Sequence, residues 1–406
     1  MGSATNLQGL SDVLHHLVAA EQIAGCALII SRGGEIVYES AKGFASIERH
    51  RAMDLNAIFR IYSMSKLFTA TAVMMLQEET NLSLDDPISN YLPAFESTPV
   101  QAVNDQGDPC LVAKQRPITV GDLLLHRSGI GYVFTLENTP LHKLYQQAAL
   151  FHHQRSTAEM VDLLATLPLA FQPGSAELYG HSYDVLGRLI EVICGQSLED
   201  FLQARLFQPL GMADTSFMVP AEKCQAFTDL YTYSADRKLI LVDDGSKSMG
   251  RGPSRLLAGG TGLLSTAMDC LRYFEMLLDH GRYKGQRVVA GAALDSLIRH
   301  CLPQRTIAGD GIGSGLVAAR NDENNHSQSV SCPSFFSRGA AGTIAWVDPG
   351  RQMVALFMTQ LLPPLMVTRH YPSMGTETID PSFACAHPDM FSFIPLIKNQ
   401  IDAALP

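Results

Sequence analysis

The spacing of apolar residues changes along the chain, and these changes predict where helices and strands lie. Residues 8–21 carry apolar side chains at helical spacing, which indicates an amphipathic helix. β-Rich runs at 24–31 and 35–38 flank a Gly-Gly pair, so we expect two strands joined by a turn. The apolar segment 67–76 has no glycine or proline and follows a serine-rich stretch, which predicts a buried helix.

The middle of the chain differs from its two ends. Between residues 80 and 240, segments with helical patterns are separated by proline and glycine. The clearest predicted elements from here onward are helices at 120–125, 158–167, 182–194, 268–278 and 393–404 and strands at 343–347 and 353–358. We therefore expect one sheet assembled from both ends of the chain, with an all-α lobe inserted and a ligand cleft between the two.

The length of 406 residues allows two or three lobes at the usual size of about 150 residues per domain. We expect a single catalytic unit over residues 1–406. Its α/β body takes residues 1–80 and 285–406 approximately, and its helical lobe takes residues 81–284.

Composition narrows the possible partners. Hydrophobic residues make up 46% of the chain and charged residues 17%, so a compact globular protein is expected. The net charge of −10 disfavours nucleic acid and anionic membranes, which need a basic face. No apolar run approaches 18 residues and no signal-like start is visible, so we expect a cytoplasmic protein acting on a small molecule. The cysteines and histidines show no metal-ligand spacing, and we expect neither a metal nor another cofactor.

A Ser-x-x-Lys string, Ser63 to Lys66, is the first candidate for chemistry. Residues three apart share a helix face, so the hydroxyl and the amine can approach each other. A lysine in desolvated surroundings can accept the serine proton, and the N–H groups at a helix start can hold an oxyanion. The alternative interpretation is a serine near a helix N-terminus beside a solvated lysine.

A second candidate nucleophile is Ser182 in the segment Gly180-His181-Ser182-Tyr183-Asp184. It is similar to the Gly-x-Ser-x-Gly elbow of α/β-hydrolases, but it ends in aspartate and lacks a convincing preceding strand. We therefore favour Ser63.

Several segments, in order, resemble serine hydrolases of the class C β-lactamase fold, especially the family VIII carboxylesterases. The segments that carry the resemblance are 59–66, 118–130, 173–187, 259–266, 339–349 and 357–360. The resemblance implies a β-lactamase/transpeptidase-like α/β (α+β) fold, in which helices flank an antiparallel sheet and an all-α lobe is inserted. It also identifies Tyr179 as the catalytic tyrosine.

The resemblance implies a serine carboxylesterase that hydrolyses small or medium acyl esters through an acyl-enzyme on Ser63. Lys66 and Tyr179 then act as one coupled general base and acid. The backbone N–H groups of Ser63 and Ala340 are expected to form the oxyanion hole. The alternatives are an acyltransferase of the same fold, and a weak β-lactamase or penicillin-binding module.

The chain departs from β-lactamases at two anchors. His181 replaces the asparagine two residues after the tyrosine, and Ser337-Arg338-Gly339 replaces Lys-Thr-Gly, so an esterase is favoured over a β-lactamase. Arg338 can imitate the missing lysine only if its side chain faces the cleft. For His181 a structural role is the alternative, and for the aromatic candidates it is core packing. The substrate-binding candidates are Tyr62, Tyr132, Phe134, His181, Arg338 and Gly339.

Overall fold

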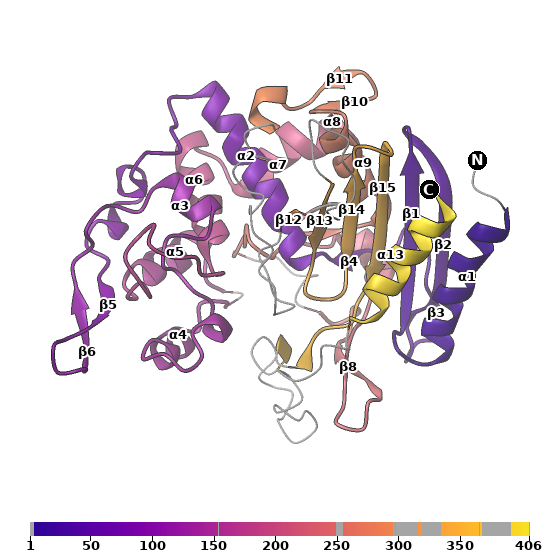
Figure 1. The fold of residues 1–406 in the computed structure, drawn as a ribbon, viewed down its shortest axis with the longest axis horizontal. Coiled ribbons are helices and arrows are strands. Elements are labelled where there is room, and N and C mark those ends of the chain that lie inside the picture. The colour runs from indigo at the N-terminus through magenta and orange to yellow at the C-terminus, as the bar shows by residue number, and fades with distance from the viewer. Residues whose placement is uncertain are drawn as a thin grey trace.

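The computed structural model describes residues 4–152, 154–248, 255–294, 297, 316–318, 334–364, 366–367 and 391–405. In this part of the chain the main sheet has seven antiparallel strands, in the order β12-β13-β14-β15-β1-β2-β3 (Figure 1). Their bounds are Leu316–Ala318, Phe335–Arg338, Ile344–Asp348, Met353–Thr359, Gly25–Arg32, Glu35–Ser46 and Arg51–Ala52. The prediction that both ends of the chain build one sheet is confirmed.

The central strands β1 and β15 are buried on both faces because helices cover each side. Cys26, Leu28 and Ile30 pack into one core with α1 (Ala4–Ala19) and α13 (Phe393–Ala404). Ala27 and Ile29 point to the opposite face and join the larger core, which includes α9 (Ala267–Leu278). A strand buried on both faces reads as a continuous apolar run, which is the pattern seen at these residues.

The buried helix predicted at 67–76 is α2 (Ser65–Glu79), and it lies beside α6 (Ser182–Cys194) in the larger core. Every residue of α2 from Ser65 to Leu76 is buried. The 3₁₀ turn η1 (Tyr62–Met64) precedes it and follows the short strand β4 (Phe59–Arg60), which pairs with β9 (Leu264–Ser265). Five further α-helices contribute residues to this core. They are α3 (Val120–Leu124), α4 (His142–Ala148), α5 (Thr157–Ala165), α7 (Leu198–Leu202) and α8 (Gln208–Leu210).

The range 81–284, predicted to be an all-α lobe, also contains β-structure. The hairpin of β5 (Val100–Val103) and β6 (Pro109–Val112) turns through Asn104, whose side chain accepts two backbone N–H bonds. A second hairpin joins β7 (Leu230–Tyr233) to β8 (Leu239–Asp243). Short strands between such turns carry little periodic signal, so the helical segments around them dominated the pattern. Helix α9, also in this range, packs on the main sheet; the exact division into body and lobe stays a prediction.

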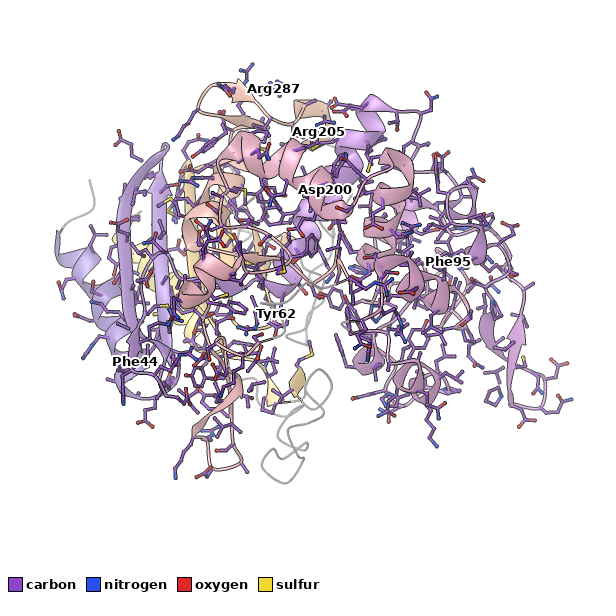
Figure 2. All side chains as sticks on the ribbon, turned by 180° about the vertical axis from the view of Figure 1, so that it is seen from behind. Phe44, Tyr62, Phe95, Asp200, Arg205 and Arg287 are labelled. Carbon is purple, nitrogen blue, oxygen red and sulfur yellow. The ribbon has the colours of Figure 1, made fainter. Side chains whose placement is uncertain are left out.

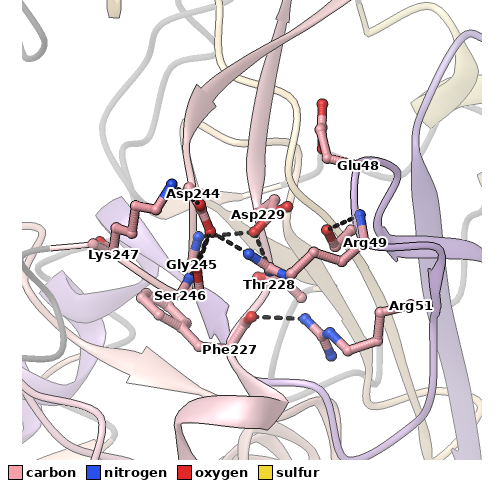
Figure 3. A network of polar contacts seen from close by, with 12 residues as sticks. Glu48, Arg49, Arg51, Phe227, Thr228, Asp229, Asp244, Gly245, Ser246 and Lys247 are labelled. Carbon is pink, nitrogen blue, oxygen red and sulfur yellow. Dashed lines mark hydrogen bonds and ion pairs between the residues drawn. The ribbon is translucent and has the colours of Figure 1, made fainter.

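A charged network fixes the β7–β8 hairpin to the turn between β2 and β3 (Figure 3). Arg49 pairs with Asp229 at 2.6 Å and also with Asp244, and Asp229 accepts the Gly245 N–H at 2.8 Å. Arg51 donates to the Phe227 carbonyl at 2.6 Å. The network ties together segments about 180 residues apart in sequence, close to where the chain enters β7.

None of the helices in the described ranges is long and apolar enough to cross a membrane.

Candidate active site

Ser63 and Lys66 lie where the 3₁₀ turn η1 passes into helix α2. The Nζ atom of Lys66 lies 3.2 Å from the Oγ atom of Ser63, so the structure brings the predicted pair together. Tyr62, just before Ser63, has φ of +43°, a left-handed conformation that is unfavourable for a bulky residue. Such strain next to a candidate nucleophile is typical of functional sites.

Tyr179 reaches the same point from the segment before α6. Its hydroxyl lies 2.6 Å from the Oγ atom of Ser63, and Lys66 Nζ lies 4.6 Å from the centre of its ring. Thr135 Oγ1 donates to the Tyr179 carbonyl at 2.9 Å. A Cβ atom at Gly180 would lie 2.1 Å from the Ile130 carbonyl oxygen, so glycine is required for this close approach. The three residues predicted to act together therefore meet in space.

Lys66 is 1% exposed, which agrees with the desolvated surroundings expected from the sequence. Besides Ser63, its Nζ atom donates to the Tyr132 hydroxyl at 3.3 Å and to the Gly260 carbonyl at 2.8 Å. These three acceptors match the three N–H donors of an ammonium group. The role of the Gly260 carbonyl cannot be seen in the sequence, because every residue has a backbone oxygen whatever its identity.

Tyr132, a candidate for lining an acyl pocket, is instead buried in contact with the Lys66 amine. It is 5% exposed, and its ring packs against Phe134 with 5.2 Å between ring centres. Burial raises the pKa of Tyr132 well above its usual value, and the charges of Asp184 and Tyr179 act in the same direction. Tyr132 therefore stays protonated and serves as a polar partner of Lys66 at neutral pH.

His181 is also a buried residue. It is 2% exposed, and its Nδ1 atom lies 2.9 Å from the Asp184 carboxylate, so the structural interpretation holds rather than the substrate contact. The other carboxylate oxygen of Asp184 accepts the Gly260 N–H at 2.9 Å. The His181–Asp184 pair thus holds the loop whose carbonyl receives Lys66.

The alternative nucleophile Ser182 is fully buried. Its hydroxyl bonds to the hydroxyl of Ser128 at 3.0 Å, and it begins helix α6 after an irregular segment rather than after a strand. A nucleophile elbow requires an exposed serine on a strand-to-helix turn, so this interpretation is wrong.

The end of strand β13 lies against the nucleophile turn. A Cβ atom at Gly339 would be 2.3 Å from the Ile61 carbonyl oxygen, so only glycine allows this approach. The Gly339 N–H already donates to the Thr343 carbonyl at 2.8 Å. This bond takes Gly339 out of the oxyanion hole and keeps Ala340 as the expected backbone donor.

Arg338 is half-buried at the same strand end. Burial lowers its pKa, while the charge of Tyr179 acts in the opposite direction. Arg338 stays a predicted substrate contact.

A small apolar cluster lies beside these residues. Its buried members are Leu230, Val242, Ala341, Leu362, Met366 and Val367. Half-buried Tyr62, Phe134, Ile240 and Ala340 pack against it. Figure 2 shows Tyr62 between the sheet and the helical region. Of the predicted substrate contacts, Tyr62 and Phe134 therefore keep exposed apolar surface, whereas Tyr132 and His181 do not.

No group of three or more His, Cys, Asp or Glu side chains that could hold a metal ion occurs within the described ranges.

The fold together with a serine, lysine and tyrosine in mutual contact is typical of serine hydrolases. A family model described as Beta-lactamase matches residues 10–372, and the chain belongs to this family of serine hydrolases. Its fold is the β-lactamase/transpeptidase-like fold that the sequence predicted.

Curated relatives include proteins named as esterases. The chain is 29% identical over 377 residues to protein Rv1367c of Mycobacterium tuberculosis, covering 89% of this chain and 92% of that protein. It is 30% identical over 294 residues to esterase EstB of Burkholderia gladioli, covering 66% of this chain and 69% of that protein. It is 31% identical over 253 residues to lovastatin esterase of Penicillium rubens, covering 60% of this chain and 61% of that protein.

Solved structures with the same fold include two enzymes. EstCE1, described as a hydrolase with promiscuous acyltransferase activity, has a TM-score of 0.72 at 21% identity, with 99% of both chains covered. Simvastatin synthase LovD from Aspergillus terreus has a TM-score of 0.73 at 21% identity, also with 99% of both chains covered. At this identity the likeness shows the fold.

Proposed function

We propose that this protein is a serine carboxylesterase that hydrolyses small or medium acyl esters through an acyl-enzyme on Ser63. The observation that carries the proposal is the position of the Ser63 hydroxyl, 2.6 Å from the Tyr179 hydroxyl and 3.2 Å from the Lys66 amine. A serine becomes nucleophilic when a neighbouring base accepts its proton, and both neighbours lie within reach.

In the first half-reaction, the Lys66–Tyr179 pair reacts in a form one proton short of lysine ammonium plus tyrosine hydroxyl. The Ser63 proton passes to this pair while Oγ attacks the ester carbonyl carbon. The backbone N–H groups of Ser63 and Ala340 receive the oxyanion. The tetrahedral intermediate collapses, the carbon–oxygen bond to the alcohol breaks, and the proton returns to the alkoxide through Tyr179. The alcohol leaves, and the acyl group stays on Ser63.

In the second half-reaction, water gives a proton to the same pair and attacks the acyl carbonyl. Collapse of this second intermediate releases the carboxylic acid and restores the Ser63 hydroxyl. The half-buried apolar surface of Tyr62, Phe134 and Ala340 supports an acyl group without charge.

One further observation favours an ester over a β-lactam. The histidine at the place of the β-lactamase asparagine is buried and paired with Asp184. Sequence identity does not separate the two, because EstB, lovastatin esterase and a penicillin-binding protein are relatives at 29% to 31% identity. Transfer of the acyl group to an alcohol is the second candidate, because its first half-reaction is the same and EstCE1 is described as capable of both.

The test compares wild type with Ser63→Ala on p-nitrophenyl acetate and butyrate. We expect hydrolysis by wild type, none above background by the variant, and covalent labelling of Ser63 by a fluorophosphonate probe detected by mass spectrometry. Full activity of Ser63→Ala would overturn the proposal. Product analysis with an added alcohol separates hydrolysis from transfer, and nitrocefin reports any β-lactam hydrolysis.

A further inference from the structure

His126 is a buried polar residue that the mechanism above does not use. It follows helix α3 and is 6% exposed. Neither ring nitrogen has a hydrogen-bond partner among the described residues. Leaving buried nitrogens unpaired destabilises the folded state, so the position needs a reason for carrying histidine rather than an apolar residue.

The ring of His126 lies against the ring of Tyr179. The two ring centres are 4.8 Å apart. The ring of Tyr183, a residue of helix α6, also faces His126, with 5.1 Å between the ring centres. His126 therefore supplies a flat surface that restricts how the Tyr179 ring can tilt. The Tyr179 hydroxyl, at the opposite end of that ring from its backbone, is the group that meets Ser63.

The backbone of His126 holds the same segment. The His126 carbonyl accepts the Leu178 N–H at 2.8 Å, and the next carbonyl, of Arg127, accepts the Gly174 N–H at 2.8 Å. Leu178 directly precedes Tyr179. The turn after α3 thus contacts the ring of the candidate catalytic tyrosine and accepts hydrogen bonds from the backbone that precedes it.

This turn explains the choice of residue. His126 has φ of +54°, in the left-handed region. Asn, Asp and His are enriched there, whereas bulkier residues are disfavoured. Histidine combines a flat ring with tolerance of this backbone, and that combination accounts for its presence despite the unpaired nitrogens.

The charge state of His126 fits this role. Burial, together with the positive charge of Lys66, lowers the pKa of His126 to about 3. The ring is therefore neutral at physiological pH and adds no second positive charge beside Lys66 and Tyr179.

We propose that His126 is a positioning residue for Tyr179, with its ring setting the tilt of the tyrosine and its left-handed backbone holding the chain at Leu178. The inference rests on the proposed function, because it assigns Tyr179 the proton-transfer role. His126 acts in this proposal through Tyr179 and takes no part in the proton transfer itself.

The test uses variants that separate ring from backbone. His126→Asn and His126→Gly keep the left-handed turn and remove the ring, and His126→Phe keeps a ring. His50→Asn is the matched control, since His50 also has a positive φ, 50°, but lies exposed in the turn between β2 and β3. Thermal unfolding checks that each variant is folded, and p-nitrophenyl butyrate provides kcat and KM.

We expect kcat to fall about tenfold to a hundredfold in His126→Asn and His126→Gly, with KM changed less than about threefold, because misplacement of a catalytic group acts on the transition state. His126→Phe should recover part of the kcat lost in the other two and should unfold at a lower temperature than wild type, because phenylalanine is disfavoured in the left-handed backbone at this position. His50→Asn should match wild type.

A double-mutant cycle shows whether the effect passes through Tyr179. In a Tyr179→Phe background, His126→Asn should lower kcat less than about twofold, because the hydroxyl that it positions is gone. An equal loss in both backgrounds, or wild-type kcat in folded His126→Asn and His126→Gly, would overturn the inference. Failure of the proposed function is seen separately, as full activity of Ser63→Ala or of Tyr179→Phe alone.

Discussion

The hydroxyl of Tyr179 lies 2.6 Å from the Oγ atom of Ser63, although 116 residues separate them in the sequence. Ser63 is placed by the turn before α2, and Tyr179 by the segment before α6. These two helices pack side by side in the core. The contact that defines the site is therefore a consequence of how two buried helices meet.

Removing one oxygen tests the role of this contact. Tyr179→Phe keeps the ring and its packing against His126 but removes the hydroxyl that we propose exchanges a proton with Ser63. We expect kcat on p-nitrophenyl butyrate to fall by about 10²–10⁴-fold, the usual size of a general acid–base contribution. Steady-state kinetics measure the loss. Tyr145→Phe is the control, because Tyr145 is buried and its hydroxyl donates to the Pro168 carbonyl at 3.2 Å rather than to Ser63.

Lys66 is expected to be equally necessary. Lys66→Met keeps a long, unbranched side chain and removes the amine, so the Gly260 carbonyl and the Tyr132 hydroxyl lose their shared donor. We expect at least a hundredfold loss of kcat, about the lower end of acid–base effects. A burst experiment with p-nitrophenyl acetate should show that acylation is the slowed step. Exposed Lys143→Met serves as the control, and an unchanged burst rate in Lys66→Met contradicts the coupled role.

Restoring the β-lactamase residue at position 181 should not create β-lactam hydrolysis. His181 faces Asp184 in the protein interior, and a shorter asparagine loses that 2.9 Å contact without reaching the substrate side. We expect His181→Asn to show no gain in nitrocefin hydrolysis and to lower the free energy of unfolding by about 1–3 kcal/mol, the cost of an unpaired buried group. Nitrocefin kinetics and urea unfolding measure the two effects. His15→Asn, an exposed site on α1, is the control; a gain in nitrocefin hydrolysis would place position 181 in the substrate site.

His126 should leave a signature in the pH dependence of stability. Its pKa is about 3 in the folded protein against an ordinary value of 6.5, because of burial and the charge of Lys66. Besides Lys66, the titratable groups that face its ring are Tyr179 and Tyr183. Between pH 6.5 and 3 the unfolded chain binds the extra proton, so this residue makes the free energy of unfolding decrease as pH falls through that window.

The slope from one such group is at most about 1.4 kcal/mol per pH unit. Urea unfolding at several pH values between 7 and 4 should therefore show a shallower loss of stability in His126→Asn than in wild type. A constant cost of the substitution cancels in this comparison, because only the slopes are compared. Equal slopes would show that His126 takes up a proton in the folded state as readily as in the unfolded chain.

Local features were predictable because they depend on neighbours in sequence. The expected helices at 182–194 and 393–404 match α6 and α13, since apolar spacing and flanking turn residues define a helix without reference to the rest of the fold. The approach of Lys66 to Ser63 was predictable for the same reason, as a spacing of three brings side chains together. The likeness of several segments to known serine hydrolases added Tyr179.

The remaining features depend on contacts between distant segments. The sequence left a substrate contact or a structural role open for His181, and a pocket wall or core packing open for Tyr132. Packing directed the first toward Asp184 and the second toward Lys66. The Gly260 carbonyl and the left-handed turn at His126 are backbone features that residue identity does not reveal. By itself, the sequence determined elements such as α6 and α13 and the Ser63–Lys66 pair. Only the tertiary structure decided which groups surround that pair. The reason is that the burial and the direction of a side chain are set when separate segments pack together.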